Sequence, residues 1–288
     1  MSVNSSSAYN NFLDDSCSTV DFYINIGFDL LKVILIVPLC TLVLCVAHQR
    51  WRQQRSFKTA SHADIITYHM VVIEPIWILG GFCYLSGTYT NDSLMITVGL
   101  NVRYTTCYAG IFLHLLTCVE RYLAVVHPIT YLGLRNARGV KIRNISIGCT
   151  WLLSFGMILV RVLYMPNNIT IQQCVLVISI IIISSCSLSV LYVLICSGPR
   201  ERVREKELVN QTKQRAFYTI TAILGMFWLW LVGLFVNITV SQYPQLNTNI
   251  KCVLDMFLSL FNLPSHLVLP LLYLQRAGKL KYCFYKNK

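Results

Sequence analysis

Charged residues are scarce in this 288-residue chain, and acidic residues are half as frequent as basic ones. Lys, Arg, Asp and Glu together make up 12% of the sequence, against about 25% in an average soluble protein, while hydrophobic residues make up 55%. The mean hydropathy is +0.57. A soluble domain of this length could not bury so much apolar surface in one core. The composition excludes an ordinary soluble protein and indicates that lipid surrounds much of the chain.

Sequence motifs of the common enzyme classes are also missing. The chain contains no HExxH, GxSxG, paired CxxC or Gly-rich phosphate loop, so we expect no enzyme activity, no cofactor and no metal site. It contains no internal repeat, which argues against a transporter built from repeated halves. The net charge is +12, but the basic residues fall in short clusters between apolar runs, so we expect no nucleic-acid partner.

Seven apolar runs are long enough to cross a bilayer as helices, since about 20 residues suffice. They predict an all-α integral membrane protein, a seven-transmembrane helix bundle, with an extracellular N-terminal tail at 1–21, a helical domain at 22–274, and a cytosolic amphipathic helix and tail at 275–288. Residues 1–21 lack Lys, Arg and an apolar segment, so we expect no signal peptide. The predicted spans are Phe22–Ala47, His62–Leu85, Ser93–Tyr122, Ile145–Tyr164, Cys174–Cys196, Ala216–Val240 and Cys252–Leu274.

The basic residues predict the orientation. Twenty of the 24 lie after the first, third, fifth and seventh runs, and segments rich in Lys and Arg stay in the cytosol. We therefore expect an extracellular N-terminus, a cytosolic C-terminus and a place in the plasma membrane. The glycosylation sequons at Asn4, Asn91 and Asn168 then lie outside, whereas those at Asn144 and Asn210 lie inside and should stay unmodified.

The end of the third run reads CVERYLAVVHPITY, residues 118–131. It resembles the signature of rhodopsin-like G-protein-coupled receptors: Glu120, Arg121 and Tyr122 at the cytosolic end of helix three, followed by Pro128. An Arg next to its own acid can be held by that acid in one state and freed to meet a partner in another. The alternative is a basic helix end that only obeys the positive-inside rule.

Other positions resemble the same family more loosely. Trp151 resembles its helix-four tryptophan, Tyr192 its helix-five switch tyrosine, and Phe227 the aromatic residue below its helix-six pivot. Pro270 and Tyr273 resemble the end of its NPxxY motif. The sequence departs from the family in several places, because Leu269 replaces the Asn of that motif, and helices five and six lack their usual prolines. Residues that bind sodium in relatives are also only partly matched, by Asp64, Gly110 and Ser265.

The resemblance implies a receptor that passes an extracellular ligand signal to heterotrimeric G proteins, with membrane lipid around it. The ligand is not identified, although an anionic group or a chemosensory role fits. A silent or decoy seven-helix receptor is an alternative, and a small-solute transporter is a weaker one.

Charged residues inside the predicted spans need a partner, since insertion of each costs at least about 2.5–3.5 kcal/mol. The resemblance places Arg103 at the depth of the family's ligand pocket, and it could bind an anionic ligand group. Alternatively it forms a structural ion pair with Glu74. The other expected pocket residues are Glu74, Tyr104, Cys107 and Tyr108.

Further polar residues in the spans also suggest partners. Asp29 and Lys32 are three apart and could pair. Asp64, His114 and His266 could form a polar cluster, and Arg161 should extend to the membrane surface.

The resemblance also bears on the cysteines. The family's usual helix-three cysteine is missing, and four cysteines on the outer side allow three pairings. A Cys83–Cys174 disulfide would restore the family's clamp on the second outer loop, which leaves Cys17–Cys252 as the second pair. Cys283, in the tail, is either palmitoylated or free.

Overall fold

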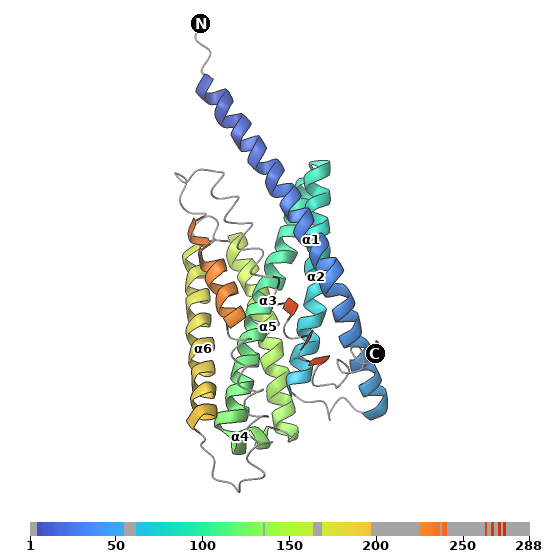
Figure 1. The fold of residues 1–288 in the computed structure, drawn as a ribbon, viewed down its shortest axis with the longest axis vertical. Coiled ribbons are helices and arrows are strands. Elements are labelled where there is room, and N and C mark those ends of the chain that lie inside the picture. Colours follow the sequence, from blue (N-terminus) through green and yellow to red (C-terminus); the bar gives the residue numbers. More distant parts are fainter. Residues whose placement is uncertain are drawn as a thin grey trace, which may run out of the picture.

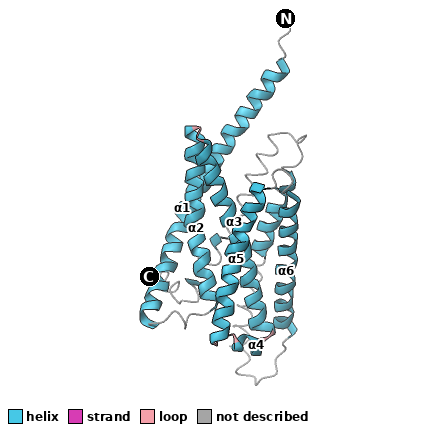
Figure 2. Ribbon diagram, turned by 180° about the vertical axis from the view of Figure 1, so that it is seen from behind, coloured by secondary structure: helices cyan, strands magenta, loops and turns pink. Residues whose placement is uncertain are grey.

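The computed structural model describes residues 5–54, 62–134, 136–163, 169–196, 225–236 and 238–240, and residues 263, 266–267, 270–271 and 273–274. The elements in this part of the chain are α-helices, which run side by side as a bundle (Figure 1, and from behind in Figure 2). They are α1 (Ser5–Gln54), α2 (His62–Thr90), α3 (Ser93–Val126), α4 (Pro128–Gly133), α5 (Ala137–Leu163) and α6 (Ile169–Cys196).

Five of these helices are long and apolar enough to cross a membrane, as expected of an integral membrane protein. The stretches are Ile26–Gln49, Asp64–Thr90, Ser93–Val126, Arg138–Leu163 and Thr170–Val193. A shorter apolar helical stretch covers Gly225–Val240, within the sixth predicted span. Only scattered residues of the seventh predicted span are described, and residues 275–288 lie outside the described part.

The first five predicted spans are helical, but the helices extend beyond the apolar runs. Helix α1 begins at Ser5 instead of Phe22, so most of the expected N-terminal tail continues the helix, and its first turns project from the bundle (Figure 1). Helix α5 begins at Ala137 instead of Ile145. The 34 residues of α3 span about 51 Å at 1.5 Å per residue, longer than a hydrocarbon core of about 30 Å. Polar residues can therefore continue a helix beyond the lipid.

Helix α3 is the central element, since it packs against α2, α5 and α6, while α1 packs against α2. The α2–α3 contact is very close at Gly99. A Cβ atom there would lie 2.8 Å from both the Gly80 carbonyl oxygen and the Tyr84 Cα, so only glycine fits this position. The two helices are joined by a tight turn in which Asn91 has φ 56° and Asp92 caps α3 by accepting from Leu94 N–H at 2.9 Å.

Two apolar clusters hold the bundle together. The larger joins α2, α3, α5 and α6 to the 225–236 segment, and it includes Ile111, Leu113 and Leu231. The smaller joins α1 and α2 to Tyr273 and Leu274 near the end of the seventh predicted span. This contact brings the seventh predicted span next to the first two helices.

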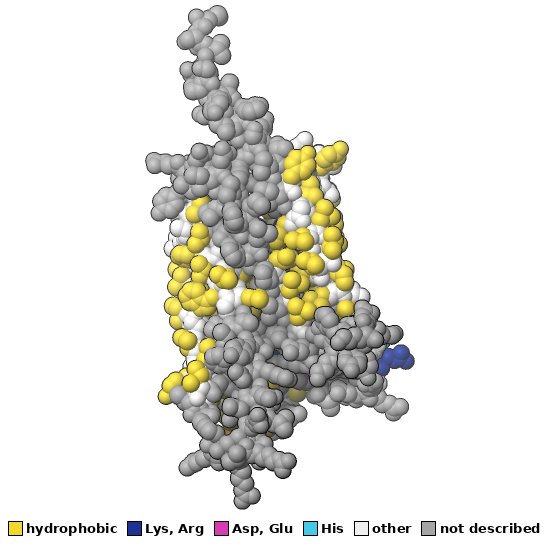
Figure 3. Space-filling view, viewed as in Figure 1, with side chains coloured by type: hydrophobic (Ala, Val, Ile, Leu, Met, Phe, Trp, Pro, Cys, Tyr) yellow, Lys and Arg dark blue, Asp and Glu magenta, His cyan; other side chains and the backbone are white. Residues whose placement is uncertain are grey.

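The outward faces of the long helices carry large hydrophobic side chains. On the face shown in Figure 3, most visible side chains of the described residues are hydrophobic. Helix α6 exposes Ile178, Ile181 and Leu188, each more than half accessible. Exposed apolar surface of this extent fits contact with lipid, in which backbone groups must bond within their own helix.

Candidate functional site

The Arg121 end of α3 is tied to the short helix α4. The Tyr131 hydroxyl of α4 donates a hydrogen bond of 2.8 Å to Glu120 Oε1, and the Glu120 side chain is buried. Pro128 occupies the first turn of α4, where its missing N–H has no intrahelical partner to lose. Arg121 is half-buried, and no salt bridge joins it to Glu120 among the described residues. The acid is thus held by a tyrosine that the sequence did not single out.

Tyr122 follows Arg121, and its side chain contacts His127 instead of Glu120 or Tyr131. Its hydroxyl lies 3.2 Å from His127 Nε2, and the two rings meet edge to face with centroids 5.5 Å apart. The contact is exposed, and it links the last turn of α3 to the residue that connects α3 with α4.

Tyr192 and Tyr273, the two tyrosines that resemble residues of the receptor family in helices five and seven, have opposite surroundings. Tyr273 is buried, with its hydroxyl 3.0 Å from the Tyr68 hydroxyl of α2 and the two ring centroids 5.6 Å apart. Pro270, one turn earlier, is also buried. Tyr192 on α6 is 68% exposed and faces away from the bundle, so the structure does not bring it together with Tyr273. Its position in the sequence cannot show which side of α6 is covered.

The buried charged residues have other partners than the two ion pairs suggested by the sequence. Arg103 Nη2 of α3 lies 3.5 Å from Asp29 Oδ1 of α1, so the suggested Arg103–Glu74 ion pair is wrong. Glu74 instead bonds through Oε1 to His266 Nδ1, which connects α2 to the seventh predicted span. Because α1 inserts its acid beside Gly81 of α2, Asp29 reaches Arg103 directly.

The suggested Asp29–Lys32 pair is not formed either. Lys32 is completely buried, and its Nζ has no hydrogen-bond partner within the described part of the chain. The ammonium lies 4.4 Å from the ring centroid of Trp77 and 5.1 Å from that of Phe28. Arg103 Cζ lies 5.0 Å from the Trp77 centroid, so this indole contacts two cations. Trp77 follows Glu74 by three residues, a helical spacing that could have pointed to it.

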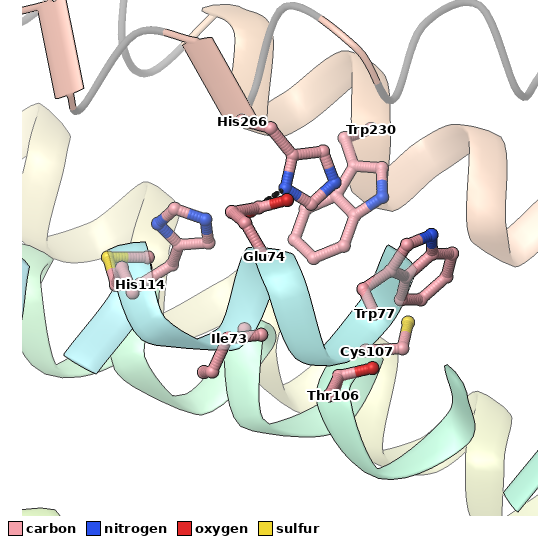
Figure 4. A pocket seen from close by; sticks show the side chains of 10 residues that line it. Ile73, Glu74, Trp77, Thr106, Cys107, His114, Trp230 and His266 are labelled. Atoms are coloured by element: carbon pink, nitrogen blue, oxygen red, sulfur yellow. Dashed lines mark hydrogen bonds and ion pairs between the residues drawn. The ribbon is translucent and has the colours of Figure 1, made fainter. Parts of the chain in front are cut away.

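A small cavity lies beside Trp77, among the side chains of Glu74, His114 and His266 (Figure 4). Of the predicted pocket residues, Glu74 and Cys107 line it, whereas Arg103, Tyr104 and Tyr108 do not. Only about 20 Å³ is open to the centre of a water-sized sphere, and one water needs about 10–15 Å³. The cavity accommodates a water molecule or a monatomic ion, which is far less than an organic ligand requires. Its other lining residues are Met70, Ile73, Trp77, Thr106, Gly110, His114, Trp230 and His266.

The expected polar cluster is partly present in this cavity. His114 and His266 both line it, but the acid between them is Glu74, and Asp64 lies outside the lining. The His114 ring packs edge-on against Phe227 with centroids 3.7 Å apart. Trp230 completes the site, with ring centroids 5.8 Å from His114 and 6.1 Å from His266. The sequence did not point to Trp230, because its tryptophan does not stand at the position that the resembled family uses in helix six.

Tyr104 and Tyr108 face the other side of α3. Their ring centroids lie 5.4 Å apart, and Arg161 Cζ of α5 lies 4.1 Å over the Tyr104 ring. The prediction that Arg161 extends to the membrane surface is therefore wrong, because its guanidinium stacks inside the bundle. Adjacent residues on α3 point to different neighbours, so the five predicted ligand-pocket residues do not form one site.

The predicted Cys83–Cys174 disulfide is also wrong, because both residues are free thiols. Cys83 is on α2 and Cys174 is exposed on α6, and both helices pack against α3. Cys252 and Cys283 lie outside the described residues, as do Asn4 and Asn168, and the side chain of Cys17 is not described. Asn91 is exposed in the turn between α2 and α3.

No family model matches the chain.

The Trp151 indole, which the resemblance singled out, donates to His69 Nδ1 of α2 at 3.5 Å and so joins α5 to α2.

Proposed function

We propose that this chain is a seven-transmembrane receptor that transmits an extracellular ligand signal to heterotrimeric G proteins at the plasma membrane. The observation that supports it most is the Arg121 end of α3. A half-buried arginine there lies next to a buried acid, and that acid is occupied by Tyr131 of α4. Arg121 is thus left available to a partner that approaches the end of the bundle.

In this proposal the signal reaches that end through α3 and the seventh predicted span. The outer half of α3 carries Arg103, Tyr104 and Tyr108, and its inner end carries Glu120 and Arg121. The Tyr68–Tyr273 contact joins the seventh span to α2, which packs on α3 along its length. Rearrangement of these contacts would change what Glu120 and Arg121 present to a G protein, as a two-state switch requires.

The test measures nucleotide exchange on a panel of purified G proteins by the protein in lipid nanodiscs. We expect Arg121→Ala to lower basal exchange by about tenfold or more, a usual size for coupling between sites. We expect Glu120→Gln to raise it, because the amide oxygen still accepts the Tyr131 hydroxyl while the charge that attracts Arg121 is gone.

Arg138→Ala is the matched control, since it removes an exposed arginine from the first turn of α5 and should leave exchange unchanged. Surface expression is measured for each variant to separate signalling from folding. Basal exchange that Arg121→Ala leaves at the wild-type level would contradict the proposal. A well-folded wild type that activates no member of the panel would favour the silent-receptor alternative instead.

A further inference from the structure

The residues of the cavity beside Trp77 include more hydrogen-bonding groups than the described part of the chain satisfies. The indole Nε1 atoms of Trp77 and Trp230 are buried without a hydrogen-bond partner in the described part of the structure, as are His114 Nδ1 and Glu74 Oε2. An indole N–H can only donate. Because a buried unpaired donor costs about 1–3 kcal/mol, two in one small cavity indicate that an acceptor occupies it.

Both indoles contribute from the same end of the cavity. In Figure 4 their nitrogen atoms lie at the Cys107 end, away from His114. They come from different elements, since Trp77 is on α2 and Trp230 is on the 225–236 segment. An acceptor between them would bridge α2 and the 225–236 segment, in addition to the ring contacts that both indoles make with His266 and the apolar cluster that the two elements share.

The charges around this end favour an anion as that acceptor. Lys32 and Arg103 both lie against the Trp77 ring, and cations on its face draw electron density from the N–H and strengthen it as a donor. Arg103 is paired with Asp29, whereas Lys32 has no ion-pair partner within 4 Å in the described part. Its positive charge is enclosed in a low-dielectric interior, where it acts over several ångströms.

Glu74 is the group that opposes an anion here. Its Oε1 is bonded to His266, and the Lys32 ammonium attracts the carboxylate, whereas its Oε2 has no hydrogen-bond partner in the described part of the chain. Asp29 is turned toward Arg103 and does not line the cavity. The one acid that lines the cavity is therefore bonded through Oε1 only, and it lies with the Lys32 cation nearby.

We propose that this cavity is a binding site for a monatomic anion of the chloride type, held by Trp77 Nε1 and Trp230 Nε1 and attracted by Lys32. The volume open to the centre of a water-sized sphere, about 20 Å³, is that of one particle of roughly water-like size and excludes an organic anion. The site is independent of any G-protein activity, because it is built from contacts within the bundle. Its occupation stabilises the packing of the 225–236 segment against α2 and α3 by mass action.

The experiment measures thermal unfolding of the purified protein in nanodiscs while sodium chloride replaces sodium gluconate at constant ionic strength. Gluconate is too large for the cavity. We expect the Tm to rise saturably, by about 3–5 °C at 150 mM chloride, and sodium bromide to act likewise. Trp230→Phe keeps a ring but removes the donor, so it should remove most of the chloride-dependent rise.

Trp228→Phe is the matched control. It lies on the same segment, and its Nε1 already donates to Ser184 Oγ of α6 at 2.9 Å. It should keep the full chloride response. An equal Tm of the wild type in chloride and gluconate overturns the proposal and assigns the cavity to water, as does a full response in folded Trp230→Phe. If Trp230→Phe does not fold, equilibrium binding of radioactive chloride to the wild type is measured instead. We expect one bound ion per chain, and the absence of bound chloride would overturn the proposed site.

Discussion

Lys32 shows how a cation is accommodated inside a membrane span. Its side chain is completely enclosed, and its ammonium contacts the rings of Trp77 and Phe28. A lysine at the centre of a span costs about 2.5–3.5 kcal/mol on insertion scales, and a desolvated cation–π contact returns about 2 kcal/mol. Attraction from Glu74 and Asp29 offsets more of the cost. The charge is therefore stabilised by several partial contacts instead of one ion pair.

Tyr68 and Tyr273 provide a testable contact at the same scale. We expect Tyr68→Phe and Tyr273→Phe each to lower the free energy of unfolding by about 0.5–1.5 kcal/mol, because each removes the hydroxyl pair at 3.0 Å. The double variant should lose less than the sum of the two, since the shared bond can be lost only once. Thermal unfolding in detergent checks this, with the exposed Tyr89→Phe as the control. Strict additivity would show that the two hydroxyls act separately.

Helix α3 organises the bundle at the scale of elements. Its successive faces meet α2, α5 and α6, and each face carries a different kind of contact. Arg103 and Cys107 lie toward α1, α2 and the cavity, whereas Tyr104 and Tyr108 lie toward Arg161 of α5. This partition follows from 3.6 residues per turn, which turns neighbouring side chains about 100° apart.

The close packing of α2 on α3 predicts a strong effect at Gly99. We expect Gly99→Ala to destabilise the protein by about 1–3 kcal/mol or more, because its methyl group would meet backbone atoms of Gly80 and Tyr84 that cannot rotate away. Gly156→Ala in α5 is the matched control, since nothing lies within 4 Å of that position. It should be neutral or slightly stabilising, as alanine favours a helix. Yield and Tm of the two variants are compared, and equal values for both would disprove the close contact.

Within the part of the chain that the structure describes, five long helices present apolar side chains on their outer faces, and the charged residues Asp29, Lys32 and Glu74 are buried between helices. The charges of a membrane protein also set its orientation, which the lysines and arginines of the connecting segments predict here. In this predicted orientation, with the N-terminus outside, the turn at Asn91 would face the secretory lumen and the start of α5 would face the cytosol.

Two exposed sequons test this orientation. We expect Asn91→Gln to increase electrophoretic mobility by the mass of one glycan, and Asn144→Gln to leave it unchanged, because only lumenal sequons meet the glycosylation machinery. Enzymatic removal of glycans should erase the difference between the wild type and Asn91→Gln. A mobility change for Asn144→Gln would show that the orientation is opposite to the predicted one.

Some of these properties follow from the sequence alone. The membrane class and the existence of the first five helices follow from apolar runs, because a chain in lipid must form helices about 20 residues long. The sequence predicted that His114 and His266 lie near each other, because buried polar groups need partners, but it named Asp64 as their acid where the structure has Glu74. The sequence also marks the end of α3 through Glu120, Arg121 and Pro128.

Only the tertiary structure decides which partners meet. Arg103 pairs with Asp29, Glu74 with His266, and Glu120 with Tyr131. Each pair joins two different helical segments, so the spacing of residues along one helix could not predict it. The rotation of each helix about its axis determines these choices. That rotation is set by glycine contacts and ring packing between helices, which are distributed over the whole bundle.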